Sequence, residues 1–219
     1  MTKRFLIIFA ALLVTAGLAS ANTLGPITTT TPISPMTTDW SESPDITSLA
    51  FAQFNSALGT LTKVKLELSG DMDTEISITN TGSSPSSGTV STHLLVYVKH
   101  SELSLGEPQI NTLSPPLVFT NLAVDATATG SFDDIELYAL KNYTSSTILT
   151  AFTGTGSIVL DADTYTTTAL EASGSFDSSQ ITDVSLTGTV TYEYTIPEPA
   201  TITLLCAGAF ALLKRKSSK

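Results

Sequence analysis

The sequence predicts an all-β protein: an antiparallel β-sandwich of jelly-roll type, flanked by an N-terminal signal helix and a short C-terminal transmembrane helix. Two observations predict the sandwich, namely many short stretches in which apolar and polar residues alternate and turn-forming residues at intervals of roughly ten positions. Threonine, which is favoured in strands, is abundant. In the central part, only residues 46–58 carry helical spacing, and they predict one short helix.

Residues 1–21 have the three parts of a secretory signal peptide. Lys3 and Arg4 form the positive start, residues 5–18 are apolar, and Ala19 and Ala21 occupy the two small-residue positions of a cleavage site. We therefore expect signal peptidase to cleave after Ala21 and the chain to be exported.

Residues 22–45 form a Thr-, Ser- and Pro-rich entry segment with four prolines. Little of this segment is periodic, so we expect an extended stretch that donates one edge strand. The predicted β-sandwich domain then covers residues 46–196.

Alternation is clearest in several stretches of this domain. Val64, Leu66 and Leu68 share one face of a predicted strand whose other face is charged, and the pattern continues to Ile78. The strand at residues 90–98 carries apolar side chains on both faces, which favours a strand that is covered on both sides. Further strands are predicted at residues 117–124 and 184–196.

Other stretches are less clear. Residues 130–138 are compatible with a strand that contains a bulge or with one helical turn. Three short β segments are predicted between residues 148 and 170, at 148–152, 158–160 and 165–170. Turns at residues 154–156 and 161–163 are expected to separate them.

Charge and cysteine content exclude several functions. Between residues 22 and 196 the chain has four lysines against 19 acidic residues. Such a surface repels phosphate backbones, so we expect no nucleic-acid binding. The one cysteine, Cys206, lies in the C-terminal apolar stretch, so the domain has no disulfide, zinc–thiolate site or cysteine nucleophile.

Alternating carboxylates make a weak candidate metal site. Asp71, Asp73 and Glu75 would line one face of a strand or, in a loop, ligate calcium. Asp161 and Asp163 form a weaker version of the same pattern. The turn glycine and the bidentate glutamate of an EF-hand are missing from their positions. Solvated acidic residues are the favoured interpretation, calcium is the alternative, and no other cofactor is expected.

The sequence contains no recognisable catalytic motif. His93 and His100 are its two histidines, and no serine lies in a G-x-S-x-G elbow. We expect both histidines to be structural or exposed, and we expect no enzymatic activity.

Aromatic side chains are a second candidate for binding, because sugar rings stack on aromatic planes. Most of them belong to alternating strands, which favours packing in the core or between strands. The aromatic residues considered are Trp40, Tyr138, Tyr143, Tyr165, Tyr192 and Tyr194.

The last 23 residues consist of a short proline–acid motif, an apolar stretch and a basic cluster. As a helix, the 14-residue apolar stretch would be about 21 Å long, which is shorter than a hydrocarbon core of about 30 Å. The basic cluster is expected to keep its end in the cytoplasm. Because the stretch is short, we expect it to anchor the protein in the inner membrane only transiently; a plain membrane anchor is the alternative. The three parts are Pro197, Glu198 and Pro199; residues 200–213; and Lys214, Arg215 and Lys216.

This arrangement closely resembles the PEP-CTERM sorting signal of Gram-negative bacteria that produce exopolysaccharide. Residues 196–201, the short apolar stretch, the terminal basic cluster and the signal peptide carry the resemblance. It implies recognition by an exosortase, a membrane cysteine protease of transpeptidase type, with processing at or near Pro197, Glu198 and Pro199. It also implies delivery to the cell surface or the extracellular matrix.

Two stretches of the domain resemble the choice-of-anchor E domains. Residues 51–64 are similar to the segment that leads into the first long strand of those domains, and residues 188–194 are similar to their closing strand. Asn55 and Ala57 depart from the usual acidic residue and serine. These domains carry no established activity, so the resemblance implies no chemistry.

The sequence therefore predicts an exported structural or adhesive protein of the cell envelope or the exopolysaccharide matrix, without catalysis. The alternatives are a carbohydrate-binding module of the same matrix and, third, a hydrolase. Besides the two processing enzymes, exopolysaccharide is the expected partner.

Overall fold

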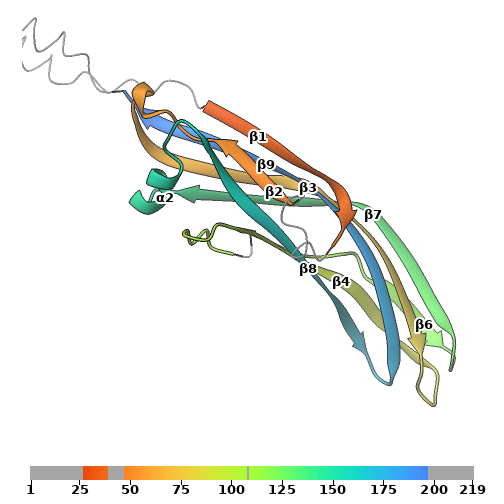
Figure 1. Cartoon of the computed structure of the whole chain (residues 1–219). Coiled ribbons are helices and arrows are strands. Elements are labelled where there is room, and N and C mark those ends of the chain that lie inside the picture. Colours follow the sequence, from red (N-terminus) through yellow and green to blue (C-terminus); the bar gives the residue numbers. More distant parts are fainter. Residues whose placement is uncertain (1–26, 39–46, 108, 197–219) are drawn as a thin grey trace, which may run out of the picture.

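The computed structural model describes residues 27–38, 47–107 and 109–196, which form two antiparallel β-sheets packed face to face (Figure 1). The first sheet has the strand order β1-β9-β3-β7. The second has the order β2-β8-β4, with β5 and β6 following one another along the other edge of β4. The prediction of an all-β antiparallel sandwich is confirmed. The elements are β1 (Ile27–Thr37), β2 (Ser48–Ala52), the 3-10 helix η2 (Ser56–Leu58), β3 (Thr60–Asn80), β4 (Ser86–Lys99), β5 (Ile110–Leu113), β6 (Leu117–Leu122), β7 (Thr127–Tyr143), α2 (Ser146–Ala151), β8 (Ser157–Ala172) and β9 (Phe176–Thr195).

The long strands β3 and β9 set the length of the molecule. They pair from Thr60 opposite Thr195 to Asn80 opposite Phe176. At about 3.3 Å per residue, a strand as long as β9 spans about 65 Å. The two sheets bend together along this length, and β4 and β8 lie on the inner side of the bend (Figure 1).

The two ends of the described core lie close together. Ile27 pairs with Tyr192, and Thr60 pairs with Thr195, so both Ile27 and Ile196 lie at the end of the sandwich that carries α2 (Figure 1). We call this the α2 end. The opposite end, the turn end, consists of the turns at residues 81–85, 123–126 and 173–175.

A layer of buried hydroxyl groups divides the core into two hydrophobic clusters. The Thr74 hydroxyl lies 2.8 Å from that of Thr92, across the sandwich, and 2.9 Å from that of Thr182 on the neighbouring strand. All three threonines are at least 98% buried. The larger cluster lies towards the α2 end. The smaller one, at the turn end, consists of Ile76, Ile78, Val90 and Phe119 with partly buried neighbours.

The helix predicted at residues 46–58 is wrong. Residues 48–52 form the edge strand β2, and only Ser56–Leu58 are helical, as one 3-10 turn. Leu49 and Phe51 are fully buried while Ala50 between them is exposed, so the two-residue period of a strand applies here. Ile46 lies outside the described residues.

The strand predicted at residues 148–152 is also wrong, because residues 146–151 form α2. Ile148 and Phe152 are four positions apart and both are buried, which is the spacing of a helix face. The Phe152 N–H donates to the Ile148 carbonyl at 3.0 Å. A run of five residues is too short for its apolar pattern to separate a helix from a strand.

Two other local predictions are resolved by strand pairing. The turn expected at residues 161–163 is wrong, since β8 runs through it with Ala162 fully buried. Residues 130–138 form a strand with a bulge, one of the two alternatives. Its pairing with β3 shifts between Met72 and Thr74, where Asp134 has a φ of 55°.

The entry segment does donate an edge strand, β1, as predicted. Pro32 and Pro35 lie within it, and a sheet edge tolerates proline because no second neighbouring strand requires the N–H that proline lacks. The Thr31 hydroxyl donates to the Ala50 carbonyl of β2 at 2.6 Å and so links the two sheets along this side.

The signal peptide (1–21) and the C-terminal segment (197–219) lie outside the described residues. Within the described ranges, no helix has the length and apolar character needed to cross a membrane.

Thr74→Val tests the hydroxyl layer. We expect a loss of about 1–2 kcal/mol in the free energy of unfolding, because the hydroxyls of Thr92 and Thr182 lose a buried partner. Replacing all three threonines with valine should recover most of this loss, since the paired hydroxyls are then removed together. Urea unfolding measures both variants, with the exposed-face variant Thr189→Val as control. A triple variant less stable than the single one would contradict this account.

From the buried Tyr143 we predict that the free energy of unfolding falls at alkaline pH. Burial, assisted by the charge of Glu107, raises the pKa of Tyr143 to about 12, and its hydroxyl donates to the Leu105 carbonyl at 2.9 Å. The unfolded side chain ionises near pH 10. Its contribution to stability is therefore complete below about pH 10 and falls as the pH rises to about 12.

Tyr143→Phe should flatten this decline, at the cost of about 1 kcal/mol at pH 7 for the lost hydrogen bond. Thermal unfolding between pH 8 and 12 measures the effect. Tyr138→Phe, at an exposed position, should keep the wild-type profile. Identical pH profiles for Tyr143→Phe and the wild type would show that Tyr143 is not responsible.

Candidate functional site

The outer face of the second sheet brings two tyrosines together. Because side chains alternate along a strand, the buried Val96 and Val98 of β4 direct Tyr97 and Lys99 outward. On β8, Asp163 lies opposite Tyr97, and Tyr165 lies opposite Leu95. We call the five outward residues the tyrosine platform: Leu95, Tyr97, Lys99, Asp163 and Tyr165.

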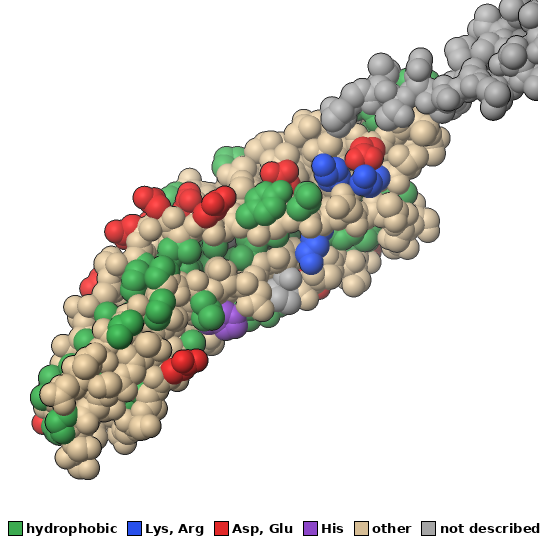
Figure 2. Space-filling view, turned by 180° about the vertical axis from the view of Figure 1, so that it is seen from behind, with side chains coloured by type: hydrophobic (Ala, Val, Ile, Leu, Met, Phe, Trp, Pro, Cys, Tyr) green, Lys and Arg blue, Asp and Glu red, His purple; other side chains and the backbone are tan. Residues whose placement is uncertain are grey.

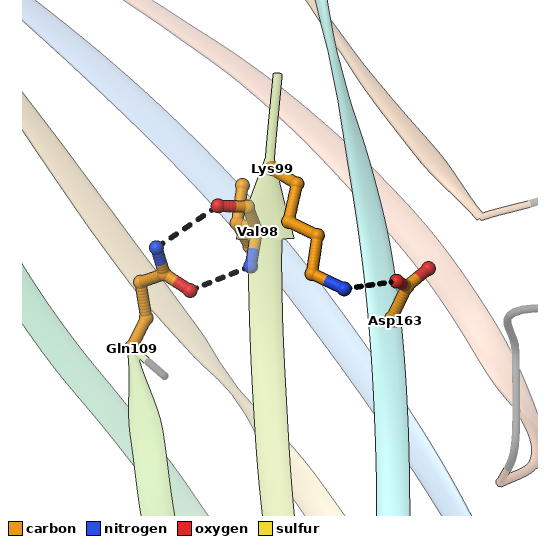
Figure 3. A network of polar contacts seen from close by, with 4 residues as sticks. All are labelled: Val98, Lys99, Gln109 and Asp163. Atoms are coloured by element: carbon orange, nitrogen blue, oxygen red, sulfur yellow. Dashed lines mark hydrogen bonds and ion pairs between the residues drawn. The ribbon is translucent and has the colours of Figure 1, made fainter. Parts of the chain in front are cut away.

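Lys99 contacts three other residues of the platform. The rings of Tyr97 and Tyr165 meet edge to face, with centroids 5.4 Å apart. The Lys99 Nζ lies 5.0 Å from the Tyr97 centroid and 5.9 Å from that of Tyr165, and it forms a 2.7 Å ion pair with Asp163 (Figure 3). The hydrogen bond to Asp163 raises the pKa of Lys99 despite partial desolvation. The platform is therefore an ordered group of apolar, cationic and anionic side chains.

At the edge of β4 beside the platform, the Gln109 side chain forms hydrogen bonds with the backbone of Val98. The Gln109 amide accepts from the Val98 N–H at 2.5 Å and donates to the Val98 carbonyl at 2.9 Å, as a neighbouring strand would (Figure 3). This fixes the start of β5, which places Asn111 opposite Leu95. The Asn111 Oδ1 lies 2.7 Å from the His93 Nε2, so polar groups border the platform on this side.

The candidate metal ligands lie on opposite faces of the sandwich. Asp71, Asp73 and Glu75 point outward from β3 in the first sheet, while Asp161 and Asp163 belong to the second. Figure 2 shows acidic side chains along one margin of the molecule. No three His, Cys, Asp or Glu side chains among residues 27–38, 47–107 and 109–196 lie close enough to hold a metal ion.

Asp71 and Asp73 lie in an extended strand, not in a loop. Asp71 faces Glu136 across to β7, and Asp73 faces Asp183 on β9. The Asp73 Oδ1 accepts from the Asp134 N–H at 2.8 Å. Asp71 and Glu136, with Ser69, Ser185 and Thr187, also line a shallow polar hollow of about 390 Å³.

The predicted aromatic set separates into buried and exposed members. Tyr143, Tyr192 and Tyr194 are at least 91% buried, whereas Tyr138 and Tyr165 are exposed on different sheets. Trp40 lies outside the described residues. Tyr97 was not among the predicted candidates. Its alternation with Val96 and Val98 signals an outward position, but its contact with Tyr165 depends on the pairing of β4 with β8.

Each of the two histidines makes a local polar contact. His93 contacts Asn111, and the Nδ1 of His100 accepts from the Glu102 N–H at 3.2 Å.

The outward face of β4 is half-exposed, so the cover predicted on both sides of this strand is absent from the described part of the chain. Two hollows of about 420 Å³ flank α2 and are lined mainly by serine, threonine and leucine.

Comparison with solved structures gives distant likenesses. No protein-family model and no curated protein matches the chain. A cryo-EM structure of Mud crab tombus-like virus is 7% identical with a TM-score of 0.19, and the match covers 85% of this chain and 89% of that one. A structure of infectious bursal disease virus is 10% identical with a TM-score of 0.13, and the match covers 79% of this chain and 42% of that one. A structure of human norovirus GI.7 is 14% identical with a TM-score of 0.15, and the match covers 83% of this chain and 36% of that one. At these TM-scores the likenesses carry no inference about this protein.

The predicted processing residues lie outside the described part of the chain. These are Ala19 and Ala21 at the signal-peptide site, the motif Pro197, Glu198 and Pro199, and the basic cluster Lys214, Arg215 and Lys216.

Gln109→Glu tests how the edge of β4 is closed. At pH 7 a carboxylate would face the Val98 carbonyl from a position that is 93% buried, so we expect a loss of about 2 kcal/mol or more in stability. The introduced carboxyl takes up a proton more readily in the folded protein. The loss is therefore complete well above pH 4.3 and shrinks as the pH falls towards that value.

Gln109→Met serves as the matched variant, since it removes both hydrogen bonds without adding charge and should show no such pH dependence. Chemical denaturation from pH 4 to pH 8 measures the difference. Equal losses at all pH values for both variants would contradict the paired-amide arrangement.

Proposed function

We propose that this chain is an exported structural or adhesive protein of the cell envelope or exopolysaccharide matrix, delivered by a PEP-CTERM signal. The observation that carries the proposal is the position of Ile196. Ile196 leaves the sandwich at the α2 end, and the residues that resemble the sorting signal follow it in the sequence; from the turn end, β9 runs about 65 Å along its length to this point. A domain held by its C-terminal segment would present both outer faces and the turn end away from the membrane.

The strand order supports a jelly-roll fold as the finer description. One sheet has the order β1-β9-β3-β7 and the other β2-β8-β4-β5. Apart from β4, β5 and β6, which share a sheet, each strand is followed by one in the other sheet, in the pattern of two Greek keys. Jelly rolls occur in capsid and lectin domains, among others. The fold is therefore compatible with a binding or structural role but does not select one.

Charge is distributed unevenly along the proposed exported domain. Its four lysines, at positions 63, 65, 99 and 141, belong to the half of the sandwich at the α2 end, with Lys63 paired to Glu193. In the other half of the first sheet all charged side chains are acidic. They are Asp71, Asp73, Glu75, Asp133, Asp134, Glu136, Asp177 and Asp183. This arrangement disfavours contact of the turn end with anionic lipids.

Mass spectrometry of the C-terminus after cell fractionation tests the proposal. We expect the protein outside the inner membrane, with a new C-terminus at or near Pro197, Glu198 and Pro199. A matched variant with these three residues changed to alanine should keep Lys219 and stay in the membrane fraction. Recovery of the unmodified wild-type chain, with Lys219 intact, in the inner membrane would overturn the processing model.

A further inference from the structure

We propose that the tyrosine platform is a binding site for a neutral polysaccharide chain. This inference deepens the adhesive role and rests on the proposed function for its biological setting. The site consists of Leu95, Tyr97, Lys99, Asp163 and Tyr165, bordered by His93 and Asn111 on the side of β5.

The platform offers both apolar surface and hydrogen-bonding groups, the two features that bind a sugar ring. Tyr165 is 42% exposed, and Leu113 at the margin is 54% exposed, so apolar surface is available to the C–H face of a sugar. Asp163 and Asn111 place fixed acceptors, and Lys99 places a fixed donor, around that surface. Apolar side chains with a few positioned polar groups are typical of sites for small ligands.

The size of the platform favours a narrow ligand over a globular protein. Three outward residues on β4, at positions 95, 97 and 99, span about 13 Å along the strand, and neighbouring strands are about 4.8 Å apart. A stable protein interface uses roughly 20–30 residues on each side. The platform and its border offer fewer than ten. The surface also lies on the inner side of the bend, where an extended chain can follow the sheet (Figure 1).

Charge selects a neutral polysaccharide over an acidic one. Lys99 is the one cation of the platform and is already paired with Asp163, with Asp161 opposite it on β8. The surrounding domain is strongly acidic. An anionic polysaccharide would therefore meet net repulsion, whereas hydroxyl groups can bond to the carboxylates at no charge cost.

Affinity electrophoresis of the full chain in a detergent without sugar headgroups tests the site. The gels contain hydroxyethylcellulose, dextran, galactomannan or, as an acidic probe, alginate. We expect at least one neutral polysaccharide to retard the protein and alginate not to do so. Tyr165→Ala and Tyr97→Ala should weaken the retardation about tenfold. Tyr138→Ala, which removes an exposed tyrosine from the first sheet, should leave the retardation unchanged, and thermal unfolding confirms that each variant is folded.

Several results would overturn the inference. They are the absence of retardation by every neutral probe, equal weakening by Tyr138→Ala, and retardation by alginate alone. A dimer in size-exclusion chromatography that Tyr165→Ala dissociates would show that a second copy occupies the surface. These outcomes are separable from failure of the proposed function, because the processing experiment measures the C-terminus and location without reference to a glycan.

Discussion

The structure depends on the long pairing between β3 and β9, which holds one face of each strand against the second sheet over nearly its whole length. The apolar residues of β3 fit this face only in one register, since a shift by one residue would turn them to solvent. Gly188 of β9 allows the second sheet to approach closely. A Cβ there would lie 2.8 Å from the Phe51 ring and 2.9 Å from Leu49. The aromatic centre of the larger cluster thus requires a glycine opposite it.

The tyrosine platform lies over the larger of the two hydrophobic clusters. The inward neighbours of its residues, Leu94, Val96 and Ala162, are fully buried in the larger cluster. The smaller cluster lies beyond the threonine layer, towards the turn end. A local opening of the turn end would therefore leave the platform intact, because the hydrophobic contacts beneath it belong to the other cluster.

Sequence reasoning succeeded where alternation is long and was wrong at residues 46–58 and 148–152, where a few apolar residues fit both a helix and a strand period. Val64 to Leu68 and residues 184–196 show a sustained two-residue period, and the corresponding strands are present. Residues 148–152 offer only five positions, so the pairing of Ile148 with Phe152 on a helix face could not be separated from a strand. The platform depends on which residue of β8 lies opposite Tyr97, and that register is set by the whole sheet. Tyr165 could therefore be named from the sequence, but its partner could not.

The two outer faces of the sandwich differ in a way that bears on how copies of the protein meet. On the first sheet, Asp71 lies opposite Glu136 and Asp73 opposite Asp183, and like charges directly opposite each other destabilise a sheet. This destabilisation does not arise at the platform, because Lys99 forms an ion pair with Asp163. The acidic face repels a second copy in the same orientation, whereas the platform combines little net charge with exposed apolar surface. If the domain contacts a matrix through one face, the physical balance therefore favours the second sheet.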